Sequence, residues 1–208
     1  MRRPDFIARQ GRHPTGCLGA IIGRIMAGET AADNDRAVAM LDIQPADRVI
    51  DIGTGHGRSL GVMAARATRG LVVGVDTSDV MLTIARRRNR ALIRKGRVQV
   101  EKCPSDNLPF PAASFDKALA VHTLYFWQPA EPHLQSIAKA LKAGGRFLLA
   151  FRPAEDTAVT ANFPTGIYTF RTTPEVESLV NACGFDVVAS ERRDIPGNTM
   201  VWLLAVRR

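Results

Sequence analysis

The sequence predicts an α/β fold, in which a mostly parallel sheet is covered by helices on both faces. Short apolar runs rich in β-branched residues, such as VIDI and LVVGVD, alternate with longer stretches of helical periodicity. Strands that are apolar on both faces are typical of a buried parallel sheet. Two further runs near the C-terminus are separated by the turn signal IPGN, which adds one antiparallel strand. We expect seven strands in a doubly wound, Rossmann-like sheet, preceded by N-terminal helices.

Length and composition indicate one globular domain without a membrane span. The chain has 208 residues, 46% of them hydrophobic, and no apolar run reaches about 18 residues. Arg24 interrupts the apolar patch near the N-terminus, which argues against a signal peptide. Three widely spaced cysteines and four isolated histidines predict neither a disulfide framework nor a metal site. A reducing cytoplasm is the simplest compartment for such a chain.

The formal net charge of +8 includes a dense basic run from Arg86 to Arg97. Basic patches can bind nucleic acid or an anionic membrane surface. No aromatic residues interleave with these arginines, as stacking on single-stranded nucleic acid would require. We therefore expect a solvated helix face and no nucleic-acid partner.

The first 29 residues predict a separate helical element. Apolar residues recur there at helical spacing, namely Leu18, Ile21, Ile22, Ile25 and Met26. The favoured interpretation is a lid helix packed on the core. The alternative is an interfacial helix whose basic flanks make peripheral contact with a membrane. A second helix is expected over Thr30–Leu41, ended by Gln44-Pro45.

The remaining elements alternate along the chain. The expected strands are Arg48–Ile52, Leu71–Asp76, Arg97–Lys102, Phe115–Val121, Arg146–Phe151, Asp186–Ser190 and Met200–Arg207. The expected helices cover residues 57–68, 79–93, 129–141 and 174–183. Ser78 and Thr173 are the predicted N-caps of the second and fourth helices. Gly144-Gly145 is predicted to close the third.

A glycine-rich turn, VIDIGTGHGRS, follows the first strand and predicts a ligand site at its carboxyl end. Dinucleotide-binding turns read G-x-G-x-x-G, with the third glycine allowing a helix to pack tightly. Here the spacing is Gly53, Gly55, Gly57, and Arg58 stands where that third glycine belongs. Asp51 precedes the turn, and an acid there suits an ammonium group better than a pyrophosphate. Both features argue against a nicotinamide oxidoreductase.

Asp76 ends the second strand, about 20 residues beyond the glycines. A carboxylate in this register can accept hydrogen bonds from both hydroxyls of a ribose. Nicotinamide and methyl-donor cofactors both contain a ribose, so Asp76 by itself fits either class.

Four ordered segments resemble the class I S-adenosylmethionine-dependent methyltransferases. The resemblance is closest to the small-molecule group (methyltransferase type 11) that includes enzymes of ubiquinone and menaquinone biosynthesis. It spans about half the chain, residues 45–152. The segments are Val49–Gly57, Gly74–Arg86, Asn107–Asp116 and Leu141–Phe147.

The resemblance implies a role for each matched residue. Asp51, Gly53, Thr54, Gly55 and Gly57 would hold the methionine moiety of S-adenosylmethionine. Asp76 would bind the ribose, Thr77 and Met81 would pack near the adenine, and Val121 and His122 would close the pocket near the sulfonium. The family often has an acid where this chain has Pro104, so Ser105 or Asp106 would bind the adenine amino group instead.

The reaction implied is in-line displacement of a methyl group from the sulfonium to a small-molecule acceptor. His122 is the candidate general base. Tyr125 and Trp127 are candidates for the acceptor pocket. Tyr168 and Arg171, from the 152–172 segment, are further candidates, and arginines at the mouth hint at an anionic acceptor. Under this interpretation residues 1–44 form a lid, residues 45–152 bind the cofactor, and residues 153–208 form the acceptor side of one domain.

Two alternatives stay open. A lipid N-methyltransferase working at a membrane surface would explain the basic N-terminal element and the positive charge. A non-catalytic S-adenosylmethionine-binding protein is permitted because the sequence identifies no unambiguous base.

Overall fold

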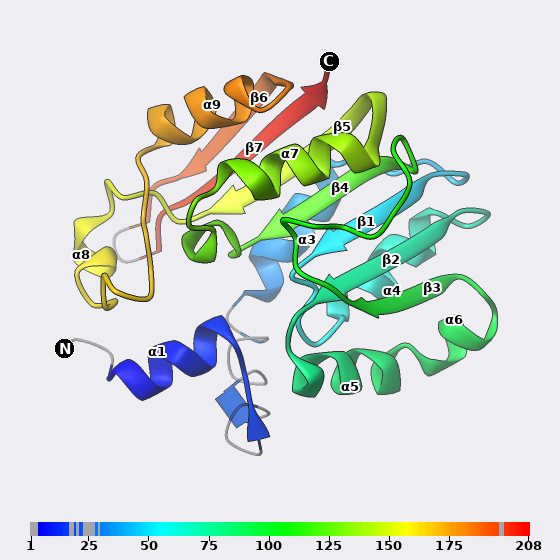
Figure 1. The fold of residues 1–208 in the computed structure, drawn as a ribbon, viewed down its shortest axis with the longest axis horizontal. Coiled ribbons are helices and arrows are strands. Elements are labelled where there is room, and N and C mark those ends of the chain that lie inside the picture. Colours follow the sequence, from blue (N-terminus) through cyan, green and yellow to red (C-terminus); the bar gives the residue numbers. More distant parts are fainter. Residues whose placement is uncertain (1–3, 17–18, 20, 23–27, 29, 196–197) are drawn as a thin grey trace.

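One seven-stranded sheet runs through the protein, in the order β3-β2-β1-β4-β5-β7-β6 (Figure 1). The computed structural model describes residues 4–16, 19, 21–22, 28, 30–195 and 198–208. The strands are β1 Arg48–Ile52, β2 Leu71–Asp76, β3 Val98–Lys102, β4 Phe115–Val121, β5 Leu141–Phe151, β6 Phe185–Arg193 and β7 Met200–Arg207. Pairing is parallel from β3 through β5, whereas β7 is antiparallel to both β5 and β6. The predicted fold class, including its single antiparallel strand, is confirmed.

Helices cover both faces of the sheet. One face packs against α3 (Ala31–Met40), α4 (Arg58–Arg66) and α5 (Asp79–Arg88). The other packs against α7 (Glu131–Ala140) and α9 (Thr173–Ala182). The short elements are α1 (Asp5–Arg12), α6 (Arg90–Arg94), the 3-10 helix η1 (Leu124–Phe126) and α8 (Thr157–Thr160). Burial of apolar residues on both sheet faces explains why the strands read as continuous apolar runs.

Several boundaries differ from the predicted ones. β5 begins at Leu141, because Leu141 pairs with Phe115 before an irregularity in the register. Gly144-Gly145 therefore lies inside a strand, although the sequence had predicted that it closes a helix. The helix expected over 79–93 is interrupted at Asn89, which separates α5 from α6. The N-cap of α9 is Thr172, which forms a capping box with Glu175, whereas the sequence favoured Thr173.

The N-terminal region holds a helix that the sequence pattern did not predict. α1 lies near the carboxyl ends of the central strands (Figure 1). The predicted helix through Leu18, Ile25 and Met26 lies largely outside the described residues. No helix within the described ranges is both long and apolar enough to span a bilayer.

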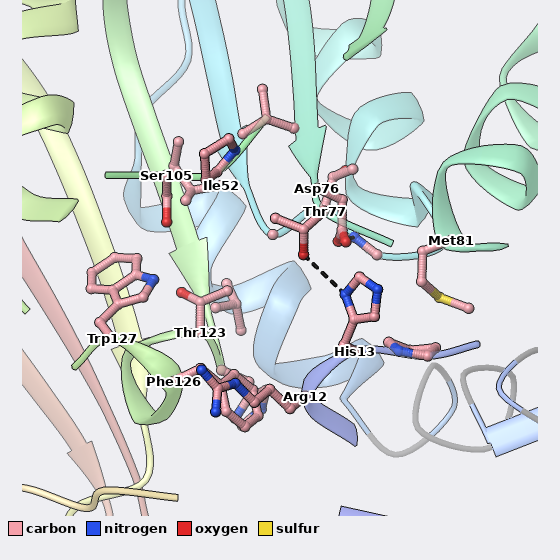
Figure 2. A pocket seen from close by; sticks show the side chains of 18 of the residues that line it. Arg12, His13, Ile52, Asp76, Thr77, Met81, Ser105, Thr123, Phe126 and Trp127 are labelled. Carbon is pink, nitrogen blue, oxygen red and sulfur yellow. Dashed lines mark hydrogen bonds between the residues drawn. The ribbon is translucent and has the colours of Figure 1, made fainter. Parts of the chain in front are cut away.

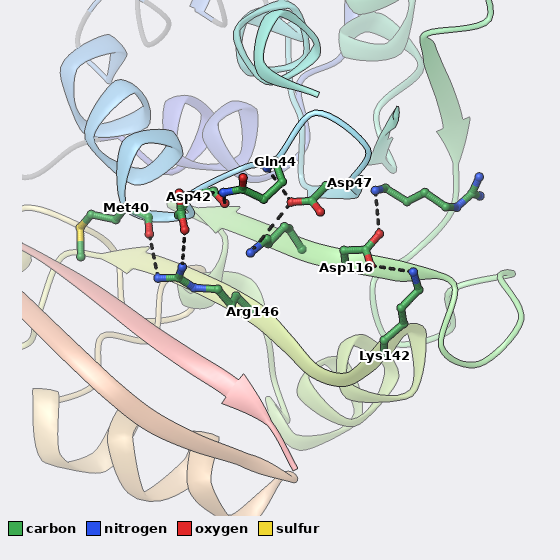
Figure 3. Close-up of polar contacts among 9 residues, drawn as sticks. Met40, Asp42, Gln44, Asp47, Asp116, Lys142 and Arg146 are labelled. Atoms are coloured by element: carbon green, nitrogen blue, oxygen red, sulfur yellow. Dashed lines mark hydrogen bonds and ion pairs between the residues drawn. The ribbon is translucent and has the colours of Figure 1, made fainter. Parts of the chain in front are cut away.

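Polar contacts fasten the opposite edge of the sheet (Figure 3). Asp116 of β4 accepts from the backbone N–H of Arg48 at 2.9 Å and from the ammonium of Lys142 at 2.6 Å. Arg146 of β5 pairs with Asp42 at 3.2 Å and donates to the carbonyl of Met40 at the end of α3. These contacts hold α3 and the starts of three neighbouring strands together, which leaves the carboxyl ends as the open edge.

Candidate functional site

A cavity of about 490 Å³ opens at the carboxyl ends of β1, β2 and β4 (Figure 2). Ligands of doubly wound sheets bind at this edge, and the volume is typical of small-molecule sites. Many residues that the sequence singled out line it, namely Gly53, Thr54, Gly55, Asp76, Thr77, Met81, Ser105, Asp106, Val121, His122 and Trp127.

The turn after β1 presents its backbone to the cavity. The N–H groups of Gly53 and Thr54 both donate to the carbonyl of Val75 at 2.9 Å. Gly53 has a φ of 70°, and a Cβ built there would lie 2.3 Å from Cγ2 of Thr123. Any side chain at position 53 would collide with Thr123, the second residue after β4. The glycine is therefore required for this close approach.

Asp51 is not among the residues that line the cavity, so its predicted role in holding the methionine moiety stays a prediction. Its carboxylate is buried, with 4% of the residue exposed, and accepts from the hydroxyls of Thr54 and Ser59. Burial raises the pKa of Asp51 to about 6; the two hydroxyls oppose the rise and the carboxylate of Asp76 adds to it. Thr54 and Ser59 do line the cavity, so Asp51 lies one layer behind them.

Gly57 also lies away from the cavity lining, and its role is packing. It precedes α4 with a φ of 71°, and a Cβ there would lie 2.7 Å from the Cβ of Ala85 on α5. The amide of Asn89 donates to the Gly57 carbonyl at 2.8 Å. The third glycine therefore lets the start of α4 pack closely against α5.

Asp76 lies at the end of β2 and faces the cavity (Figure 2). Its two oxygens accept separately from the backbone N–H groups of Gly55 and Ser78, each at 2.9 Å. Burial raises the pKa of Asp76, although its backbone hydrogen bonds oppose the rise. Each carboxylate oxygen can accept more than one hydrogen bond, so Asp76 retains capacity for two ligand hydroxyls.

The segment that ends α1 forms part of the cavity wall. Nδ1 of His13 lies 3.2 Å from the hydroxyl of Thr77, as the dashed line in Figure 2 marks. The Ser78 hydroxyl donates to the carbonyl of Pro14. These contacts hold residues 11–14 against the end of β2. No motif at these positions signals this docking in the sequence.

The loop after β3 supplies a further part of the cavity wall. Pro104, Ser105 and Asp106 all line the cavity, so the expected substitutes for the missing family acid lie there. The Ser105 hydroxyl is engaged with Nδ1 of His133 at 2.7 Å, which leaves the Asp106 carboxylate as the stronger acceptor. Cys103 of the same loop is buried, and burial raises the pKa of its thiol to about 11.

His122 follows β4 in a left-handed backbone conformation, with a φ of 59°. Nδ1 lies 3.1 Å from the Tyr125 hydroxyl, and Nε2 lies 3.4 Å from Oδ2 of Asp33 on α3. The Tyr125 oxygen also accepts from the backbone N–H of Arg152. Both ring nitrogens of His122 are therefore occupied within the protein.

Asp33 has a second partner, because the guanidinium of Arg193 on β6 lies 2.9 Å from its other oxygen. Burial acts to raise the pKa of Asp33, but contacts with His122 and Arg193 together hold it below its usual value. The side chain of Asp33 is only 5% exposed. An ionised carboxylate thus joins α3, the end of β4 and β6 behind the cavity.

Three of the four predicted acceptor-pocket residues lie behind the cavity wall. Tyr125 and Tyr168 are buried in an aromatic cluster, with ring centroids 6.1 Å apart. Burial raises the pKa of the Tyr125 hydroxyl. Arg171 donates to the carbonyls of Leu124 and Trp127 at 3.4 and 3.1 Å. Only Trp127 lines the cavity.

Several cavity residues carry no distinctive sequence signal. Arg12, Thr30 and Asn34 come from the N-terminal region, and His133 comes from α7. The cavity is also lined by His56, Thr123 and Phe126. Their positions could have been predicted, because His56 lies within the glycine turn and the other two follow β4. Burial and neighbouring arginines lower the pKa of His56 to about 4. No cluster of metal-binding side chains occurs among the residues that the structure describes.

The fold and the position of the cavity define a Rossmann-like ligand-binding protein, and solved structures share this fold. One is a Haloferax volcanii protein, the methyltransferase of a complex with the Trm112 methyltransferase activator. It is 22% identical with a TM-score of 0.77, over 90% of this chain and 93% of that one. Another is an S-adenosylmethionine-dependent methyltransferase from Aquifex aeolicus, 17% identical with a TM-score of 0.70, over 85% and 90% of the two chains.

Sequence comparison finds methyltransferases as well. Residues 50–149 match the family model described as a methyltransferase domain. An uncharacterized methyltransferase of Bacillus subtilis is 29% identical over 66% of this chain and 74% of its own length. A demethylmenaquinone methyltransferase of Symbiobacterium thermophilum is 32% identical over 59% of this chain and 49% of its own. These matches confirm the resemblance of residues 50–149 to the S-adenosylmethionine-dependent methyltransferases.

Proposed function

We propose that this protein transfers the methyl group of S-adenosylmethionine to a small-molecule acceptor by in-line displacement. The observation that carries the proposal is Asp76, whose carboxylate faces the cavity and keeps acceptor capacity for two hydroxyls. The chain spans about three quarters of the Bacillus subtilis relative and about half of the demethylmenaquinone methyltransferase. The methyltransferase activity of this chain and the class of its acceptor are therefore proposals.

The residues of the turn fit an amino-acid moiety. Thr54 and Ser59 give their hydroxyl protons to Asp51, so their oxygen lone pairs stay available to accept from an ammonium group. Asp51 would then act on the ammonium through these two hydroxyls. Asp76 would hold the ribose, with Thr77 and Met81 beside the adenine and Asp106 within reach of its amino group.

The bound cofactor would supply a methyl group already activated on a sulfonium. The work left to the chain is to hold two reactants in line and to exclude water. His122 has both ring nitrogens occupied, by Tyr125 and Asp33, which favours a positioning role over that of a general base. Its left-handed backbone turns the chain at the end of β4, where Val121 and His122 close the cavity.

A small molecule is the acceptor class that the cavity and the relatives support. The lining residues enclose about 490 Å³. One relative is named as a 27-O-demethylrifamycin SV methyltransferase from Amycolatopsis mediterranei, 32% identical over 58% of this chain, and another as a demethylmenaquinone methyltransferase. Both names denote small-molecule acceptors of those proteins.

Calorimetric titration of the pure protein with S-adenosylmethionine tests the proposal. We expect binding that weakens at least tenfold in Asp76→Asn, because the amide carries no charge and accepts through one oxygen only. Asp79→Asn is the matched control, since Asp79 lies exposed on α5 in a pair with Lys102 at 2.6 Å. Absence of binding at millimolar cofactor, or equal affinities for Asp76→Asn and the unaltered protein, would refute the proposal.

A lipid acceptor at a membrane surface is the second candidate, and α1 is the observation that favours it. This helix carries Arg9 and Arg12, and Phe6 is 59% exposed. Co-sedimentation with anionic liposomes at low salt discriminates between the two candidates. If the protein stays in the supernatant, the lipid acceptor is excluded. In a separate assay of methyl transfer, methylated product from any acceptor would exclude the alternative of a non-catalytic S-adenosylmethionine-binding protein.

A further inference from the structure

The charged residues that line the cavity are divided between its two sides. The carboxylates are Asp76 at the end of β2 and Asp106 in the loop after β3, on the side assigned to the cofactor. On the other side the lining includes Arg12, Phe126 and Trp127. The acidic Asp33 and Asp51 lie behind the wall in contacts of their own. Of the three lining residues on the other side Arg12 carries a charge, and the carboxylate of Asp106 is near enough to act on His133.

Arg12 is the cation of that side. It ends α1 and extends toward the side of the cavity where Phe126 and Trp127 lie (Figure 2). The ion pairs formed within the described part of the chain do not involve Arg12. Its planar guanidinium can donate two parallel hydrogen bonds to one carboxylate. Arg171, which the sequence placed at the mouth, is instead committed to backbone carbonyls.

Two aromatic rings that line the same cavity are stacked on each other. The rings of Trp127 and His133 are stacked, with centroids 5.1 Å apart and planes 6° from parallel. The Ser105 hydroxyl fixes the orientation of the His133 ring through Nδ1. Aromatic side chains in a cavity wall favour an aromatic ligand.

Strong bases are scarce in the same space. Both nitrogens of His122 are occupied. Burial lowers the pKa of His133, and that of His56 falls to about 4. His13 is engaged with Thr77 on the cofactor side. A nucleophile that is already ionised at neutral pH needs no help from any of them.

From the unpaired Arg12, the stacked rings and the occupied His122, we infer that the acceptor is a flat aromatic carboxylate, held by Arg12 and methylated on oxygen. The inference rests on the proposed methyltransferase function. One carboxylate oxygen pairs with the guanidinium while an electron pair of the other forms the new O–CH3 bond. The S–CH3 bond breaks with its electrons staying on sulfur, which becomes a neutral thioether. No proton moves, and the product is a methyl ester.

The test uses three probes of one shape and different charge, namely 2-naphthoate, 2-naphthamide and 2-naphthylmethylamine. Each is titrated by calorimetry into the full chain saturated with S-adenosylhomocysteine. We expect the dissociation constant of 2-naphthoate to be at least tenfold lower than that of the amide, and the amine to bind weakest. In Arg12→Gln the advantage of the carboxylate should shrink to about twofold or less, because the charge pair is lost.

Arg9→Gln is the control, because Arg9 lies one turn earlier on the same exposed helix and does not line the cavity. It should bind all three probes as the unaltered protein does. Equal binding of carboxylate and amide, or tightest binding of the amine, would overturn the inference.

Cofactor affinity separates the remaining outcomes. If Arg12→Gln weakens S-adenosylmethionine and leaves the order of the probes unchanged, Arg12 holds the cofactor and the inference is wrong while the proposed function stands. If the unaltered protein binds no S-adenosylmethionine, the proposed function fails and the inference fails with it. Unchanged cofactor affinity combined with loss of the carboxylate preference supports the inference.

Discussion

Asp51 and Asp33 are two buried carboxyl groups in opposite electrostatic situations. Asp33 faces His122 and Arg193, and these contacts hold its pKa below the usual value. Asp51 has hydroxyl partners and no cation, and burial raises its pKa to about 6. The first is a structural ion pair, whereas the second is a carboxylate whose charge is uncompensated until a cation binds near Thr54 and Ser59.

We predict that Asp51→Asn removes a pH-dependent loss of stability. In the unfolded chain Asp51 ionises near pH 3.9, but in the folded protein it ionises near pH 6. The contribution of Asp51 to the free energy of unfolding is therefore fully present only below about pH 4. As the pH rises toward 7, this contribution falls by about 3 kcal/mol in total. The asparagine oxygen can accept from both hydroxyls and carries no charge.

Urea unfolding of both proteins at pH 4 and pH 7 measures this effect. The advantage of Asp51→Asn in the free energy of unfolding should grow by about 2 kcal/mol between the two pH values. A difference that is the same at both pH values would show that Asp51 titrates normally.

At the scale of elements, α3 is the helix that joins the two halves of the sheet. Besides the ionic contacts of Asp33, the indole N–H of Trp202 on β7 donates to the Asp33 carbonyl at 3.0 Å. At its other end α3 meets Arg146 of β5 through Met40 (Figure 3). Asp35, on the same helix, makes an exposed bidentate pair with Arg58 at 2.7 and 2.8 Å.

Two substitutions on α3 therefore should differ in cost. Asp33→Asn leaves Arg193 without a charged partner, so we expect the free energy of unfolding to fall by about 1.5–3 kcal/mol. Asp35→Asn removes a solvent-screened pair and should cost less than about 1 kcal/mol. Denaturant unfolding at pH 7 compares the two variants. Equal losses in the free energy of unfolding would contradict the conclusion that Asp33 links α3 to the sheet.

The sequence predicted the elements that are buried on both sides most accurately. The bounds of β1, β2, β4 and β7 agree with the expected ones, because continuous apolar runs end sharply at turns. Boundaries set by tertiary contacts were missed. Leu141 joins β5 through its pairing with Phe115, and Asn89 ends α5 where its amide reaches Gly57. Neither contact leaves a local pattern.

The same distinction applies to the site. Gly53, Asp76 and Trp127 follow strands, so their place at the carboxyl edge could be read from the strand pattern. Arg12 and His13 reach the cavity because α1 docks on the end of β2, and docking depends on packing that no short motif encodes. Tyr125 and Tyr168 are buried outside the cavity lining, and the sequence could not show this because an aromatic near a site is equally suited to the core.

At the scale of the molecule, the floor of the cavity belongs to the sheet and part of its roof to the N-terminal region. The division into a lid of residues 1–44, a cofactor half of residues 45–152 and an acceptor half of residues 153–208 stays a prediction. Arg12, Thr30 and Asn34 line the cavity, whereas residues 153–208 contribute none of its described lining. The N-terminal region therefore contributes more residues to the cavity wall, and residues 153–208 fewer, than the sequence indicated.

Ligand binding at such a site should stabilise the whole fold. At a concentration 100 times its dissociation constant, S-adenosylhomocysteine should add about 2.7 kcal/mol and raise the melting temperature by about 5–10 °C. Asp76→Asn at the same concentration should show a clearly smaller rise. Differential scanning calorimetry measures both, and equal shifts would mean that the ligand binds away from Asp76.

The position of β7 between β5 and β6 has a consequence for the order of assembly. The strands from β3 to β5 can pair as soon as they are synthesised, whereas β6 leaves the ribosome before the strand that must separate it from β5. Until β7 inserts, the edges of both β5 and β6 are open, and each is able to capture a foreign strand. Any condition that slows the insertion of β7 should therefore lower the yield of folded protein through aggregation, even when the site itself is unaltered.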